Sequence, residues 1–266
     1  MASADQDQLK AIFAQVDELF ATGKSPEALP LLKPYSSRSD NAEVQWRLAR
    51  LQYTIGKFFT KDQGVAKQLS VEALEAAKKA VAADERSCSA HKWMGIVLGW
   101  SSDFEGSKTK IENAYTVRDH FLKAVECNPN DPTSYHLLGV WCYNIAEMPW
   151  LQRKLAKAAL ATPPTSSYDE ALGHFVKAEQ VQPGFYVSNW LYLGKTYSQL
   201  GKKTDAKEWL SKAASVKSED PKDVEAMREA AAMSDEHQGR CMRSDEHQAG
   251  VAGLMDTRQR RGNQAV

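Results

Sequence analysis

The sequence predicts an all-α protein, a short solenoid of paired helices, because one pattern of residues recurs along it. In CNPNDPTSYHLLGVW, residues 127–141, Pro129 lies in a polar turn and Leu138-Gly139 follow within the next helical segment. A large residue followed by Gly or Ala takes the same place in three further segments, at Leu48-Ala49, Met94-Gly95 and Leu193-Gly194. No alternating apolar and polar run of strand length interrupts the pattern, so we expect no β-sheet.

Each of these segments is followed by a second helical segment with its own recurring order. In SYDEALGHFVKAEQVQPG, Phe175, Ala178 and Pro183 succeed one another, and VRDHFLKAVECNP and VEALEAAKKAVAADE repeat part of the order. A small residue lets paired helices approach closely, and proline ends a helix because it lacks an N–H and disfavours helix before it. This order is typical of tetratricopeptide repeats, in which Asp131 or Thr133 would cap the next helix.

The spacing of the repeats predicts extended inserts between the paired helices. Such repeats have a period of about 34 residues, whereas Gly95 and Gly139 lie 44 residues apart and Gly139 and Gly194 lie 55 apart. The extra residues fall in two stretches, SDFEGSKTKIENAYT (102–116) and AEMPWLQRKLAKAALATPPTSS (146–167). We therefore expect a tetratricopeptide-like helical-hairpin solenoid whose first and second helices are separated by these inserts.

Domain organisation follows from where the pattern begins and fades. We expect one tetratricopeptide-like helical domain over residues 1–233, with the best repeats in 42–218 and a weaker pair before them. DPKDVEAMREAAAM predicts a final helix with Asp220 as its N-cap and Pro221 at its first position. The pentapeptide SDEHQ occurs at 234–238 and again at 244–248, and residues 234–266 are predicted to be a disordered tail.

Composition excludes several classes of function. The chain has 266 residues, and its 34 basic and 34 acidic residues cancel, which argues against a nucleic-acid partner held by bulk charge. No apolar run approaches the roughly 20 residues that cross a bilayer, so no transmembrane segment is predicted. The 4 cysteines form no C-x-x-C pair, which is typical of reduced thiols in a cytoplasmic protein.

No residue pattern indicates catalysis, a cofactor or a metal. The sequence lacks G-x-S-x-G, H-E-x-x-H and phosphate-binding loop motifs, so we expect a protein that is not an enzyme. Four histidines, at 91, 120, 136 and 174, lie within helical repeats, where structural roles are expected. In the tail, His237, Cys241 and His247 are too few and too irregularly spaced for a zinc site, so none is predicted.

The first helices of the pairs are expected to line the concave face of the solenoid. Their periodicity places there Trp46, Arg50, Tyr53, Lys92, Ile96, Trp100, His136, Val140, Tyr143, Leu191 and Lys195. Apolar and aromatic residues with a few cations suit an amphipathic helix, or an acyl chain with an anionic head such as a phospholipid. The alternative is that the chain's own C-terminal helix fills this groove.

The second insert carries a separate candidate site. Trp150 is followed by Arg153, Lys154 and Lys157 in a segment that the repeat does not require. An apolar anchor beside basic residues suits an anionic partner or a membrane surface. The alternative is an extended helix whose tryptophan packs on the solenoid.

Most of the chain resembles the regulator of microtubule dynamics family. The resemblance rests on LLGVWCY, WLQRKLA, TPPTSSYDEAL and KAEQVQPGF, with WRLAR and AHKWMGIVLG upstream, and covers about residues 40–215. It implies an adaptor that associates with microtubules and spindle poles and affects microtubule dynamics and chromosome segregation. Some members carry an N-terminal membrane segment, which we do not expect here because the sequence shows none.

Two functions are therefore expected as alternatives. The first is a cytoplasmic adaptor on the cytoskeleton and spindle that binds tubulin or a microtubule-associated protein, with Lys108 and Lys110 joining the basic residues of the second insert. The second is a lipid-binding or lipid-transfer module that uses the apolar concave groove. Microtubule co-sedimentation would favour the first, and phospholipid that co-purifies with the protein would favour the second.

Overall fold

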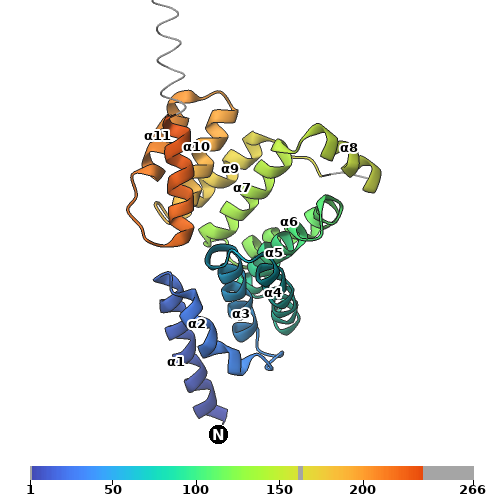
Figure 1. Ribbon diagram of the computed structural model, residues 1–266, viewed down its shortest axis with the longest axis vertical. Coiled ribbons are helices and arrows are strands. Elements are labelled where there is room, and N and C mark those ends of the chain that lie inside the picture. The colour runs from blue at the N-terminus through green and yellow to red at the C-terminus, as the bar shows by residue number, and fades with distance from the viewer. Residues whose placement is uncertain (1, 161–163, 236–266) are drawn as a thin grey trace, which may run out of the picture.

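The computed structural model describes residues 2–160 and 164–235 of the chain (Figure 1). Within these residues the regular structure is helical and contains no strand, which confirms the predicted all-α fold. Most of the predicted tail, residues 236–266, lies outside the described part, and so do the histidines and the cysteine considered there as zinc ligands. Residues 221–235 form a continuous helix, so the last described helix extends two residues beyond the predicted domain boundary at 233.

The helices pack as successive pairs, as the repeat pattern predicts. Each pair consists of two helices that are near neighbours along the chain and in space. The pairs are α1 (Ala2–Ala21) with α2 (Ser25–Leu32), α3 (Ala42–Thr54) with α4 (Gln63–Ala83), α5 (Cys88–Asp103) with α6 (Ser107–Cys127), α7 (Pro132–Glu147) with α9 (Tyr168–Val181), and α10 (Val187–Gln199) with α11 (Lys203–Ala214). Short segments η1 (Lys33–Tyr35) and η2 (Ile55–Phe59) follow α2 and α3.

Glycine allows close contact between the helices within a pair. A Cβ atom added to Gly139 would lie 2.5 Å from Phe175 Cε1, and one added to Gly194 would lie 2.6 Å from Leu210 Cγ. Gly95 meets the ring of Phe121 in the same way, at 2.4 Å. In the pairs α5–α6, α7–α9 and α10–α11, the second helix therefore lays a large side chain directly over the glycine of the first.

This contact keeps its register although the pairs differ in length. The large side chain follows its glycine by 16 residues in α10 and α11, by 26 in α5 and α6, and by 36 in α7 and α9. The first insert lies mostly in the N-terminal half of α6, a helix of 21 residues. The second insert forms a separate helix, α8 (Trp150–Ala159), which packs beside α6 and projects from the body of the solenoid in Figure 1.

The two ends of the solenoid meet, so the curvature is tight. The Lys222 ammonium lies over the Phe20 ring, 4.1 Å from its centroid. Gly23, in the turn after α1, approaches Asp220 so closely that an added Cβ would lie 3.6 Å from the carboxyl carbon. Asp220 caps the last helix as predicted, because its Oδ1 accepts a hydrogen bond of 3.1 Å from the Lys222 N–H. The concave surface is therefore largely enclosed by the chain itself.

Replacement of the contact glycines should destabilise the fold. We expect Gly139→Ala and Gly194→Ala each to lower the free energy of unfolding by about 1–3 kcal/mol, because the new methyl group overlaps a buried side chain. The larger side chain in Gly139→Leu and Gly194→Leu should cost more. Urea denaturation of each variant measures the effect as a shift of the midpoint.

Gly173, in the interior of α9, supplies a matched control. A Cβ atom added there meets nothing within 4 Å, so Gly173→Ala should raise stability by about 0.5–1 kcal/mol through the lower flexibility of the unfolded chain. If Gly139→Ala raised the denaturation midpoint as Gly173→Ala does, the helix contact would be wrongly assigned.

Candidate functional site

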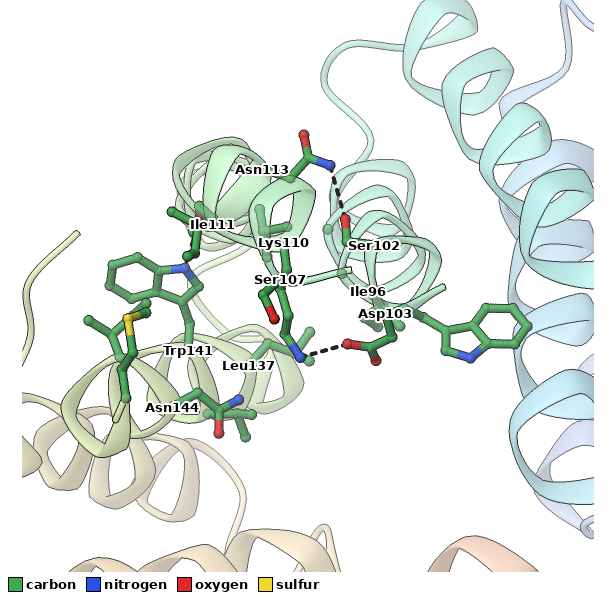
Figure 2. A pocket seen from close by; sticks show the side chains of 18 of the residues that line it. Ile96, Ser102, Asp103, Ser107, Lys110, Ile111, Asn113, Leu137, Trp141 and Asn144 are labelled. Carbon is green, nitrogen blue, oxygen red and sulfur yellow. Dashed lines mark hydrogen bonds and ion pairs between the residues drawn. The ribbon is translucent and has the colours of Figure 1, made fainter. Parts of the chain in front are cut away.

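A cavity of about 910 Å³ opens between α5, α6, α7 and the start of α8. Figure 2 shows it with the side chains of α6 on one side and those of α7 on the other. Four residues of the predicted concave groove line it: Tyr53, Ile96, Trp100 and Val140. The open part of the groove is therefore its middle section, next to the N-terminal half of α6 and the start of α8.

The cavity has an apolar wall and a polar edge. Ile111, Leu137 and Trp141 contribute apolar surface. Trp141 is fixed in place because its indole Nε1 donates a hydrogen bond of 2.8 Å to the Ala114 carbonyl. This bond ties α7 to the extended part of α6 and so holds the two walls at a constant separation.

The polar edge is formed by residues on either side of the turn between α5 and α6. Lys110 Nζ lies 2.6 Å from Asp103 Oδ1, and Asn113 Nδ2 donates a hydrogen bond of 2.9 Å to Ser102 Oγ (Figure 2). The Ser102 hydroxyl in turn donates to the Leu98 carbonyl at 2.7 Å. A ligand with an apolar body and a polar end would fit this distribution.

The C-terminal part of the predicted groove is covered by the helix of residues 221–235. Leu191 is buried with Ala226 and Ala230 of that helix. Lys195 Nζ lies 2.8 Å from Glu229 Oε1 and also over the ring of Tyr143, 5.4 Å from its centroid. In this section the chain's own C-terminal helix takes the place that a ligand would occupy.

Three other predicted groove residues stabilise contacts between helices. Arg50 binds Asp17 of α1 through Nη2 and lies over the Phe20 ring, 4.0 Å from its centroid. The adjacent Trp46 is buried. Lys92 Nζ lies 2.9 Å from Asp131 Oδ2, which links the α5 helix to the start of α7. These cations are paired with carboxylates and half or fully buried, so they are not open to an external anion.

His136, also predicted in the groove, belongs to the core between α7, α9 and α10. Its Nδ1 donates a hydrogen bond of 3.1 Å to Asn189 Oδ1, an amide oxygen that can only accept. The rings of Phe175, Tyr186 and Tyr192 surround it at centroid distances of 5.6, 5.2 and 5.8 Å. Burial lowers the pKa of His136 to about 4, although the bond to Asn189 opposes the shift. The imidazole is therefore neutral at physiological pH.

The second insert presents exposed apolar and cationic side chains together. In α8, Trp150 is 67% exposed and Leu151 is 56% exposed. Lys154 and Lys157 are exposed as well, and the Lys154 ammonium lies over the Trp150 ring, 4.5 Å from its centroid. The tryptophan thus remains at the surface, where a partner can reach it.

The basic residues considered for an anionic partner differ in availability. Arg153 Nε and Nη2 donate hydrogen bonds of 2.9 and 2.7 Å to the Met148 and Ala146 carbonyls, so this side chain secures the C-terminal end of α7. Lys110 is paired with Asp103, and Lys108 Nζ lies 3.8 Å from Glu112 Oε1. Within the described residues, Lys154 and Lys157 have no carboxylate in ion-pair distance.

Sequence reasoning missed the residues of the polar edge, above all Asp103 and Asn113. The spacing of the repeats predicts an insert between the two helices here, whereas residues 107–116 of that insert form the first turns of α6. A signal was present, since Ile111, Ala114 and Val117 follow helical spacing within and just after the insert. The network of Asp17 with the arginines of α3 had no such signal, because the partners lie 30 and 33 residues apart.

Neither a membrane span nor a metal site is found in residues 2–160 and 164–235. No helix there has the length and apolar character needed to cross a bilayer. No group of three or more His, Cys, Asp or Glu residues within this part is arranged to hold a metal ion.

The fold and its groove define the chain as a tetratricopeptide-like helical solenoid. The crystal structure of a tetratricopeptide-repeat protein of Thermus thermophilus superposes with a TM-score of 0.60 over 84% of this chain and 97% of that one, at 17% sequence identity. This likeness concerns the fold alone. It agrees with the helix pairs described above.

The chain belongs to the regulator of microtubule dynamics protein 1-3 family, whose model matches residues 12–238. Regulator of microtubule dynamics protein 1 of Bos taurus is 46% identical over 230 residues, which are 86% of this chain and 72% of that protein. The Homo sapiens protein 1 is 48% identical over 70% of this chain and 59% of its own length. Protein 3 of Mus musculus is 32% identical over 79% of this chain and 45% of its own length. The resemblance seen in the sequence is thereby confirmed.

The buried histidine predicts a loss of stability in mild acid. Because the folded-state pKa of His136 is about 4, below the ordinary value of about 6.5, the unfolded chain takes up the proton first. The contribution is fully present above pH 6.5 and declines as the pH falls toward 4, and the stability lost at pH 5 is about 2 kcal/mol. Urea denaturation at pH 7.5 and pH 5.0 measures the difference.

His136→Gln is the control, since glutamine keeps an amide donor for Asn189 and does not titrate. The variant should lose less stability than the wild type over this interval. The remaining slope includes His120 and His174, whose pKa values burial also lowers. An identical pH dependence of both proteins would contradict the assignment to His136.

Proposed function

We propose that this chain is a non-enzymatic adaptor that associates with microtubules, directly or through a microtubule-associated protein, and affects their dynamics. Family membership supports the proposal, since the relatives are named regulators of microtubule dynamics. The proposed location is the cytoplasm, at the cytoskeleton and the spindle, with chromosome segregation as the process affected. The fold suits an adaptor because paired helices present side chains on both faces.

The exposed surface of α8 is the observation that carries the proposed contact. It presents Lys154 and Lys157 without a carboxylate partner in the described residues, beside the exposed rings of Trp150. The helix contains three basic residues and no acidic one. An acidic protein surface would be attracted to it, and the attraction would be screened by salt.

Co-sedimentation with polymerised tubulin tests this contact. The Lys154→Ala, Lys157→Ala double variant should pellet less than the wild type, and raising the salt from low to moderate should weaken pelleting of the wild type. Stability should change little, because exposed charges contribute about 0–1 kcal/mol each. Arg153 is left unchanged, since its hydrogen bonds to α7 would confound binding with folding.

The Lys108→Ala, Lys110→Ala double variant is the matched control. It removes the same charge from the neighbouring helix, where both lysines have acidic partners, and should pellet like the wild type. Equal, salt-insensitive pelleting of all three proteins would remove α8 from consideration. If none of the three pelleted, an adaptor that reaches microtubules through another protein would be the remaining form of the proposal.

The cavity supports a second candidate function, a lipid-binding or lipid-transfer module. Its volume of about 910 Å³ and its apolar wall with a polar edge suit an acyl chain with a polar head. Native mass spectrometry of gently purified protein should then show added masses of phospholipid. Val140→Trp, which places a larger side chain in the cavity, should abolish them, while Val65→Trp on the exposed face of α4 should not. Lipid-free protein in every preparation would exclude this function.

A further inference from the structure

Three residues of α8 form one line along its surface. Trp150, Lys154 and Lys157 follow one another at i, i+4 and i+7, which places them on the same helical face. All three are exposed. We refer to these three residues as the α8 stripe. It has an apolar end, formed by Trp150 with Leu151 beside it, and a cationic end, formed by the two lysines.

The charge of the α8 stripe is not paired with a carboxylate within residues 2–160 and 164–235. Lys108 and Lys110, on the helix against which α8 packs, each have a carboxylate within 3.8 Å. Neither lysine of the stripe has one among the described residues. The two lysines therefore form a local positive surface that an acidic partner would complement.

The tryptophan makes the stripe more than a charged surface. Its contact with the Lys154 ammonium, 4.5 Å from the ring centroid, is a cation–π interaction that holds the two groups side by side. With 67% of Trp150 exposed, an apolar partner group could still bury much of the indole, which is among the most favourable contacts in protein interfaces. The stripe therefore offers an apolar contact and a charge contact at a fixed separation.

We infer that the α8 stripe binds an extended acidic peptide segment that carries one large apolar side chain. This inference rests on the proposed function and names the kind of partner that the same surface accepts. Along a helix axis with a rise of about 1.5 Å per residue, Lys154 lies about 6 Å and Lys157 about 10 Å from Trp150. An extended peptide advances about 3.3 Å per residue. Alternate side chains of an extended peptide share one face, so its acidic residues should stand two and four positions from the apolar one, about 7 and 13 Å away and within reach of the flexible lysine side chains.

The distribution of apolar residues favours a peptide over a membrane surface. A helix that lies in a bilayer interface buries an apolar face along its whole length. In the α8 stripe the apolar residue is Trp150, at the first turn, and the two residues that follow it along the stripe are lysines. A ligand with its apolar group at one end and its charges beyond it matches this order.

Fluorescence anisotropy with a labelled synthetic peptide tests the inference on the full-length chain. The peptide carries one phenylalanine, with glutamates two and four positions after it, in a Gly/Ser background. The Lys154→Ala, Lys157→Ala variant should bind it at least about fivefold more weakly, and Trp150→Ala at least about threefold more weakly. The Lys108→Ala, Lys110→Ala variant should bind like the wild type. A peptide of the same composition with phenylalanine eight positions from the glutamates should bind more weakly.

The contradicting outcomes separate this inference from the proposed function. Equal affinity of the wild type and the stripe variants, or of the two peptides, would overturn it. The inference would also be overturned if no peptide bound and phosphatidylserine-containing vesicles captured the wild type but not the Trp150→Ala variant. If the wild type pellets with microtubules in a stripe-dependent manner and still fails to bind the peptide, the proposed function stands and the peptide inference falls.

Discussion

The contact of a glycine in one helix with a large side chain in the next sets the geometry on which the rest of this solenoid depends. At Gly95 and Gly139 the partner is a phenylalanine ring, and at Gly194 it is Leu210. Close-packed interiors tolerate neither a gap nor an overlap at such a point. The pair must therefore form the same contact whatever lies between its two halves. Inserted residues can lengthen a helix or leave the pair, but they cannot separate the two contact residues in space.

Both solutions occur, and together they create the candidate site. In the α5–α6 pair the additional residues lengthen α6, so that its N-terminal half forms one wall of the cavity. In the α7–α9 pair they form a separate helix, α8, outside the pair. The chain then returns to the pair in α9, where Phe175 packs against Gly139. Pro149 and Gln152 of this inserted segment line the edge of the cavity. The cavity and the exposed helix thus share an origin in one packing constraint.

The same constraint explains which parts of the structure could be predicted from the sequence. The glycines, the large residues that pack on them and the prolines that follow the helices are local sequence signals. The helix pairs and the all-α fold can be predicted from them. The extent of the groove does not, because periodicity gives the face on which His136 and Lys195 lie but not what covers that face. Only the folded chain shows that His136 is enclosed by aromatic rings and that Glu229 reaches Lys195 from 34 residues further on.

The availability of charged groups was equally hidden in the sequence. Lys110 and Lys154 look alike there, yet Lys110 meets Asp103 across a turn, and Lys154 meets the ring of Trp150. Arg153 is adjacent to Lys154 in sequence, but its guanidinium is held by two carbonyls at the end of α7. A helix needs partners for its last carbonyls, and this requirement takes Arg153 out of the set of free cations. The surface that remains available to a partner is smaller than the basic cluster in the sequence. It is also more specific, because it presents one apolar ring and two charges at fixed positions along the helix.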